Sequence, residues 1–554
     1  MTDGLRKAVP EYISPNGTFV LSQDAAVVQT ESGKLRGYID GDTFTFLGVP
    51  YAVAGRYCEP QKVPAWEGVK NALVYGPVPP SYVFPYYEFM EVMTPHLYWP
   101  AAKDFQEPMI QNLNLWTQSL DETAKAPVIV MFHAGGLSSG SAVEQVGYHG
   151  KALSRFGNVV VVNVNIRLGV LGFLDLSAYG EKYRHSGNLG LMDFVSALNW
   201  VKDNISSFGG DPDNVTLFGH NIGQINLMEV PAAKGLFKRV VCLGSGSLLI
   251  PQEVSRRVAE ETLKKLEIAS ENLDQILTVP YDQLNAAATF AYEKVGPEYP
   301  QFMQGLWPSL DGDFIPEDAF GDIDHSHRTE IAKDIPMILG INFAEGSSNL
   351  QGILEGTEPP LHSMSPEELD ERLTKTFGSY KDRIVEVYRR IYPKKPLEDL
   401  IYFDANITFD EHYRGTLAGF PKVKADQNGA PVYRYMYSFE YPVMGGAMAW
   451  HTSEIAMCMN NYELMRSSFG NSAEVKAMSD LMTSYVVAFA RTGDPNFEGA
   501  PEWKPYTTEG GFVLDWDIEP SELNQHDIDE MIELIEAARK EVGWKSIFDL
   551  ADSE

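Results

Sequence analysis

Residues 219–223, Gly-His-Asn-Ile-Gly, keep both glycines of a G-x-S-x-G motif but carry Asn221 where that motif has its serine. In this motif the serine sits on a sharp turn between a strand and a helix, where its hydroxyl can attack a carbonyl group. A carboxamide is not a usable nucleophile in acyl transfer. Asparagine does tolerate a strained turn, and its side chain can both donate and accept hydrogen bonds. The segment therefore predicts a polar site that has lost its covalent step.

A second stretch matches G-x-S-x-G letter for letter, at residues 136–140, Gly-Leu-Ser-Ser-Gly. It belongs to a glycine-rich loop and does not join a strand to a helix, and the motif has meaning only in that context. We therefore do not expect Ser138 to replace the missing nucleophile.

Alternating strands and helices must hold this turn in place. Residues 127–132 and 159–164 are continuous apolar runs, typical of central strands covered on both faces. Residues 187–207 predict a helix with one apolar side, and residues 215–218 predict a short strand that leads into the turn. A strand followed by a helix, repeated along the chain, indicates an α/β sheet.

The remaining segments are expected to complete a single domain over residues 1–554. Residues 27–37 predict an antiparallel hairpin, and residues 528–542 predict a closing helix. Residues 254–412 are mostly helical and polar in pattern, which indicates a cap over the sheet.

Residues 79–105 are rich in aromatic side chains, methionine and proline but lack a clean periodicity. They predict a long loop, either simply packed on itself or forming the apolar wall of a gorge. The residues expected to contact a substrate are Tyr82, Phe84, Tyr86, Tyr87, Trp99 and Met448. Such side chains favour a bulky hydrophobic small molecule.

The composition limits the partners and the compartment. A net charge of −32 repels the phosphates of nucleic acids and anionic lipids. The three cysteines, Cys58, Cys242 and Cys458, do not form a disulfide framework. We find no signal peptide and no membrane-spanning stretch, so we expect a cytoplasmic protein, either a monomer or a homodimer. No pattern predicts a cofactor or a metal ion.

Several longer motifs stand in the order in which one known family has them. They are Phe-Leu-Gly-Val-Pro-Tyr-Ala at 46–52, Leu-Asn-Leu-Trp at 113–116, Asn-Ile-Arg-Leu-Gly at 165–169, and the stretches 204–219, 311–314 and 492–496. On these residues the chain resembles the type-B carboxylesterase and cholinesterase family of α/β-hydrolases, over nearly its whole length. The resemblance implies a large, mostly parallel central sheet with helices on both faces and helical cap insertions.

The resemblance also implies the parts of an active site. Residues 133–137 resemble the family's HGGG loop, so the backbone N–H groups of Gly135, Gly136 and Ile222 are expected to form an oxyanion hole. Glu345 and His451 match the family's acid and base, in the expected chain order. A histidine oriented by a carboxylate can exchange protons near neutral pH.

Two adjacent residues depart from the family. His220 stands where the family usually has glutamate, and Asn221 stands in place of the serine. Both new side chains are polar and can form hydrogen bonds, so we include both among the catalytic candidates. The alternative is an inactive site that drifts without constraint.

Three functions remain open. The first is a non-hydrolytic enzyme that carries out cyclisation, isomerisation, elimination or aldol-like chemistry, for example in secondary metabolism. The second is a catalytically silent binding protein, similar to the neuroligin-type members of the family. The third is slow ester hydrolysis by water that His451 activates directly.

Overall fold

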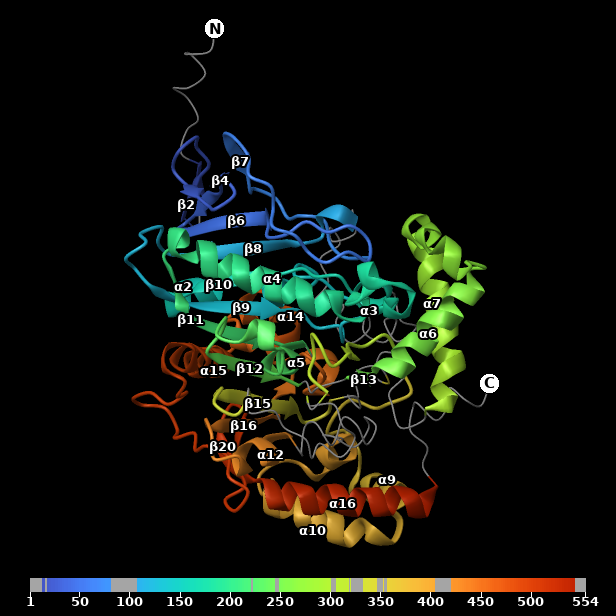
Figure 1. Cartoon of the computed structure of the whole chain (residues 1–554). Helices are drawn as coiled ribbons and strands as arrows, with labels where there is room; N and C mark the ends of the chain where they lie inside the picture. The colour runs from blue at the N-terminus through green and yellow to red at the C-terminus, as the bar shows by residue number, and fades with distance from the viewer. Residues whose placement is uncertain are drawn as a thin grey trace.

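The computed structural model describes residues 12–14, 17–80, 107–220, 223–244, 249–299, 305–317, 319, 332–345, 352, 356–403 and 420–543. Thirteen of its strands form one central sheet, which crosses the molecule from the N-terminal to the C-terminal segments (Figure 1). The strand order is β1-β2-β5-β6-β8-β10-β9-β11-β12-β15-β16-β19-β20.

The centre of the sheet is parallel, because every neighbouring pair from β10 to β19 runs in the same direction. These strands are β9 (Ala126–Phe132), β10 (Val160–Val164), β11 (Gly210–Gly219), β12 (Arg239–Leu243), β15 (Met337–Asn342), β16 (Val432–Tyr437) and β19 (Phe512–Trp516). Nearly all of their residues are buried, as strands covered on both faces require.

Antiparallel strands extend both edges of the sheet. They are β1 (Tyr12–Ser14), β2 (Gly17–Val20), β5 (Tyr38–Asp40), β6 (Thr43–Pro50) and β8 (Asn112–Thr117) at one edge, and β20 (Ser521–Asn524) at the other. A smaller sheet contains β3 (Val27–Gln29), β4 (Lys34–Arg36) and β7 (Val69–Asn71). The hairpin of β3 and β4 confirms the expected antiparallel turn.

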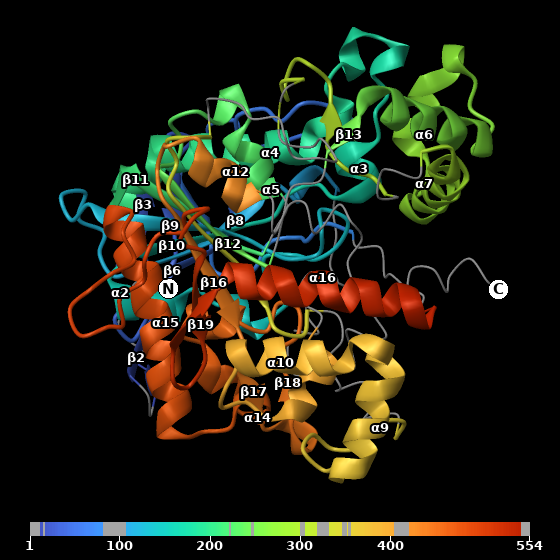
Figure 2. The same ribbon diagram turned by 90° about the horizontal axis from the view of Figure 1, so that it is seen from below.

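Helices cover the two faces of the sheet, and each face has its own hydrophobic core (Figure 2). On one face lie α4 (Leu189–Asn204), α5 (Gly223–Met228) and α12 (Phe420–Asp426); on the other lie α2 (Lys151–Gly157) and α15 (Ala473–Thr492). The alternation along β9 divides its side chains, so Val128 and Val130 pack on the α4 face and Ile129 on the α15 face. The expected α/β-hydrolase architecture is therefore confirmed.

The range 254–412, expected to be a helical cap, holds two separate helical groups. The first contains α6 (Gln252–Lys265) and α7 (Tyr281–Val295), which pack against each other. The second contains α9 (Pro366–Phe377) and α10 (Lys381–Ile391), which lie beside the closing helix α16 (Gln525–Val542), as Figure 1 shows. Between the two groups the chain returns to the centre of the sheet as β15.

Ion pairs attach α16 to α10. Arg390 bonds Asp527 at 2.9 Å and also pairs with Glu530.

Among the residues that the structure describes, no helix has the length and apolar character needed to cross a membrane.

Candidate active site

The candidate residues gather where the parallel strands end. His133 and the glycine loop follow β9, His220 follows β11, and Glu345 follows β15 by three residues. In open α/β sheets, ligands bind at the carboxyl ends of the strands. His451 comes from a separate segment, after the short strand β18 (Ala447–Met448).

Glu345 and His451 form a hydrogen-bonded pair. The Nδ1 atom of His451 bonds Oε1 of Glu345, and the backbone N–H of His451 donates to the backbone carbonyl of Glu345 at 3.0 Å. The second carboxylate oxygen, Oε2, accepts the backbone N–H of Asn342 at 2.8 Å. These contacts fix both the carboxylate and the ring.

The pair lies at the boundary between the interior and the surface. The side chain of Glu345 is 1% exposed, whereas that of His451 is 23% exposed. Burial raises the pKa of Glu345, but the charges of His451 and of the nearby His220, together with the hydrogen bond from His451, outweigh it and bring the pKa to about 2. Glu345 is therefore ionised at neutral pH. Because its Nδ1 is engaged, His451 would exchange a proton with a substrate through Nε2.

His220 is the third member of this cluster. Its ring lies 4.2 Å from the ring of His451, centroid to centroid, at an angle of 78°. Its Nε2 atom is 3.8 Å from Oε1 of Glu345, beyond hydrogen-bonding distance. Burial and the charge of His451 lower the pKa of His220 to about 4 despite Glu345. A neutral imidazole therefore faces the same carboxylate oxygen that orients His451.

A buried network behind the pair was not anticipated from the sequence. Asn342 Nδ2 donates to the backbone carbonyl of Trp450 at 2.6 Å and to Glu454 Oε2 at 2.7 Å. Tyr435 donates its hydroxyl to the other oxygen of Glu454 at 3.1 Å. Burial and the charge of Glu345 raise the pKa of Glu454 to about 7. The network ties β15 and β16 to the segment that carries His451. A polar residue at the end of the apolar strand 337–341 is the signal that could have indicated it.

The glycine loop makes a tight turn after β9. Gly135 has a φ of 104° and Gly136 a φ of 56°. A Cβ on Gly135 would lie 2.2 Å from the backbone oxygen of Ser139, so only glycine fits there. The amide of Ala134 donates to the hydroxyl of Tyr148 at 3.0 Å, which leaves the amides of Gly135 and Gly136 as the loop's candidates for an oxyanion. Their role stays a prediction.

Comparison with known proteins gives a consistent result. The model of the carboxylesterase family matches residues 24–534. The chain belongs to the carboxylesterase family. It is 30% identical to the para-nitrobenzyl esterase of Bacillus subtilis (strain 168), over 89% of this chain and 95% of that protein. It is 27% identical to the phenmedipham hydrolase of Pseudarthrobacter oxydans, over 88% of this chain and 94% of that protein.

A solved structure shows the same likeness. An esterase from the anaerobe Clostridium hathewayi, described as able to hydrolyse aliphatic aromatic polyesters, is 35% identical to this chain. It superposes with a TM-score of 0.81 and covers 94% of this chain and 99% of its own. The expected family and fold are thus both confirmed.

Several predicted site residues of this carboxylesterase-family chain lie outside the described residues. They are Asn221 and Ile222, which follow His220 in the sequence, and Tyr82, Phe84, Tyr86, Tyr87 and Trp99 in the aromatic segment. The structure brings together His220, Glu345 and His451, and it describes the glycine loop.

Met448 was also expected to contact a substrate. Its side chain is fully buried in the core on the α4 face of the sheet, where it packs with other apolar side chains. A methionine near a site fills core gaps as readily as it contacts a ligand, so its type alone did not distinguish the two.

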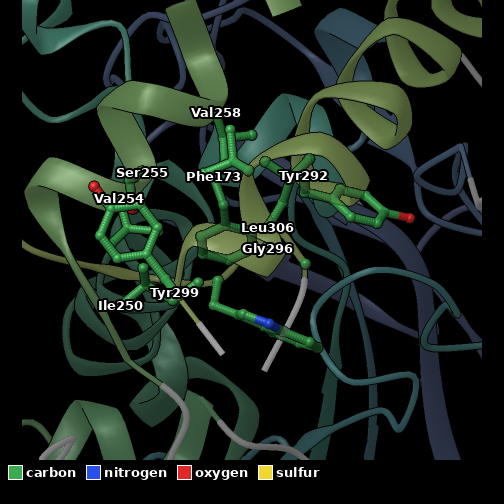
Figure 3. A pocket seen from close by; sticks show the side chains of 12 residues that line it. Phe173, Ile250, Val254, Ser255, Val258, Tyr292, Gly296, Tyr299 and Leu306 are labelled. Carbon is green, nitrogen blue, oxygen red and sulfur yellow. The ribbon is translucent and has the colours of Figure 1, made fainter. Parts of the chain in front are cut away.

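A small, mostly apolar pocket lies between α6, α7 and residues 305–307. Figure 3 shows Val258, Tyr292 and Tyr299 around this space. Trp307 and Phe173 also line it.

Proposed function

We propose that this carboxylesterase-family protein is an enzyme that transfers protons at a carbonyl group without forming an acyl-enzyme. The pairing of His451 with the buried, ionised Glu345 carries this proposal. A carboxylate that orients an imidazole makes it a base that can take a proton and return it. The reaction class is cyclisation, isomerisation, elimination or aldol-like addition, through an enolate.

The glycine loop supplies the second part of the proposed chemistry. An enolate places negative charge on a carbonyl oxygen, and backbone N–H groups aimed at that oxygen stabilise the charge. Gly135 and Gly136 provide such groups in a loop whose backbone only glycine can adopt at position 135. Asn221, as a donor and acceptor, would hold a polar group of the substrate.

The substrate is proposed to be a bulky hydrophobic small molecule that contains a carbonyl group. The aromatic composition of segment 79–105 supports this class. The negative net charge disfavours polyanionic substrates.

Hydrogen exchange in D₂O tests the proposal before a natural substrate is known. A panel of apolar ketones and aldehydes would be incubated with the protein, and deuterium uptake next to the carbonyl would be followed by NMR. We expect catalysed exchange for some members and a loss of roughly 10²–10⁴-fold in His451→Ala. The exposed His526 offers a matched control, because His526→Ala should exchange at the wild-type rate. Ligand binding with no exchange in the wild-type protein would support a silent binding protein and contradict the proposal.

A fluorophosphonate probe tests the absence of a covalent step. Such probes label activated serines, so the wild-type protein should remain unlabelled and show no burst with p-nitrophenyl esters. Labelling of any serine would overturn the proposal.

Ester hydrolysis by water activated at His451 is the second candidate. The 35% identity with an esterase over nearly the whole chain favours it. Without covalent catalysis such hydrolysis would be slow. Steady turnover of an ester without a burst, lost in His451→Ala but kept in Asn221→Ala, would select this candidate over the non-hydrolytic one.

A further inference from the structure

Three side chains of the site converge on one small volume. His220, Glu345 and His451 each offer one ligand atom, and these atoms all lie within 4.8 Å of one another. Two imidazoles and one carboxylate are ligands that Zn²⁺ binds at about 2.0–2.2 Å. Because His220 takes the place of a family glutamate, the second imidazole is a departure of this chain from the family motif.

His220 supplies an independent indication of a ligand. Its side chain is 3% exposed, and its Nε2 atom has no hydrogen-bond partner among the described residues. The nearest charged atom is Oε1 of Glu345, 3.8 Å away. Buried polar atoms in native proteins are nearly always satisfied, so an orphaned nitrogen that faces a carboxylate points to a group that binds between them.

The backbone around the cluster lets the side chains of His220 and Glu345 approach each other. Gly244, at the end of β12, has a φ of 50°, and a Cβ there would lie 2.2 Å from Nε2 of His220 and 3.0 Å from Oε1 of Glu345. Glycine thus provides the room in which the two side chains meet. The backbone N–H of Asn342 donates to Oε2 of Glu345, which leaves Oε1 facing the rings of His220 and His451. Such outer contacts orient the ligands of metal sites.

We propose that His220, Glu345 and His451 form a binding site for one divalent transition-metal ion of the zinc class. The ion would take the place of the hydrogen bond between His451 Nδ1 and Glu345, and the ring proton of His451 would move to Nε2. Ligand atoms around tetrahedral zinc lie roughly 3.3 Å apart, given bonds of about 2.0 Å. The distance from His220 Nε2 to Glu345 Oε1, 3.8 Å, is close to that spacing.

Occupation of this site would stop proton transfer, because the metal holds the carboxylate oxygen and an imidazole nitrogen that form the pair. The binding itself stands on the geometry of the three side chains. The inhibition, in contrast, rests on the proposed function.

Calorimetric titration of the EDTA-treated full chain with ZnCl₂ tests the binding without any substrate. We expect one high-affinity ion per chain. Co²⁺, used as a spectroscopic probe, should give the visible absorption bands of a four- or five-coordinate site.

Variants locate the ion. His220→Gln and Glu345→Gln should each weaken Zn²⁺ binding more than the roughly 10–100-fold that follows loss of an outer contact. His185 provides a control, because its ring also faces carboxylates, 2.7 Å from both Glu59 and Asp313, but is far more exposed than that of His220. His185→Gln should leave the high-affinity site unchanged, and circular dichroism should verify the fold of each variant.

Absence of a high-affinity ion in the wild-type protein would overturn the proposal, as would loss of that ion in His185→Gln but not in His220→Gln. Neither outcome would contradict the proposed function, because the D₂O exchange tests that function separately. Conversely, a protein that binds Zn²⁺ through His220 but shows no exchange would refute only the proposed function. If both hold, Zn²⁺ should suppress exchange in the wild-type protein, and EDTA should restore it.

Discussion

At the scale of single residues, the chain differs from its family motif at two adjacent positions and keeps the residues that would surround them. His220 and Asn221 replace a glutamate and a serine, whereas Glu345 and His451 remain paired. The replacement of glutamate by histidine removes a negative charge and places a neutral ring against the remaining carboxylate. The described site therefore keeps a paired imidazole and carboxylate, while position 221 carries a carboxamide in place of a hydroxyl.

Restoring the nucleophile tests whether the rest of the site is a working esterase frame. Asn221→Ser should react with a fluorophosphonate and hydrolyse p-nitrophenyl acetate roughly 100-fold or more above wild type, because loss of a serine alone removes far more than that in related machinery. Asn221→Ala should do neither. A folded Asn221→Ser protein that stays unlabelled would show that the loop or the base is not aligned for acyl transfer.

At the scale of elements, the ends of three neighbouring strands determine the site. β11, β12 and β15 lie side by side; His220 and Gly244 directly follow the first two, and Glu345 follows β15 by three residues. The parallel register places these ends at one edge of the sheet. Gly244 lies between the other two, and its missing side chain lets them approach.

Gly244→Ala should therefore disturb the cluster specifically. The new Cβ would meet the His220 ring, and the residue also has a positive φ. We expect a loss of about 2–4 kcal/mol in the free energy of unfolding, the sum of backbone strain and overpacking. Gly235→Ala is the matched control, because Gly235 has a φ of 80° but no atom within 4 Å of its would-be Cβ, so only about 1–2 kcal/mol should be lost. Denaturant titration measures both. Equal losses of unfolding free energy in Gly244→Ala and Gly235→Ala would show that the His220 ring is not in close contact with Gly244.

At the scale of the whole molecule, buried carboxyl groups link stability to pH. Asp515 in β19 is 3% exposed, and Ser438 donates its hydroxyl to it at 2.6 Å. Burial raises the pKa of Asp515 from 3.8 to about 7, although Lys395 opposes the shift. Because the folded-state pKa lies above the unfolded-state value, the stability that Asp515 contributes is complete below pH 3.8. That contribution is lost as the pH rises to about 7.

Asp515→Asn should remove this dependence. The difference in free energy of unfolding, Asp515→Asn minus wild type, should become about 2 kcal/mol more favourable to the variant as the pH rises from 5.5 to 8.5. Denaturant unfolding at several pH values measures it, and Asp213→Asn at an exposed position controls for a general effect of the amide. A pH-independent difference between Asp515→Asn and wild type would mean that Asp515 stays ionised in the fold.

The sequence by itself determined the fold class, the family and the central strands. Runs such as 127–132 and 159–164 are apolar because both faces of those strands are covered, and this requirement is local enough to be read from adjacent residues. The strand at 337–341 is apolar enough to be predicted, but its position in the central sheet, which divides the described part of 254–412 into two helical groups, depends on neighbours that are distant in sequence.

The family resemblance predicted that Glu345 and His451 pair, but only the tertiary structure decided how the side chains are arranged. His451 and Glu345 are 106 positions apart, and nothing in the spacing of the sequence gives the orientation of His220 against them. Their convergence depends on the order of β11, β12 and β15 in the sheet and on the space above Gly244. The buried contacts of Asn342 and the core position of Met448 are likewise invisible in the sequence, because they depend on packing between segments that are far apart in the chain.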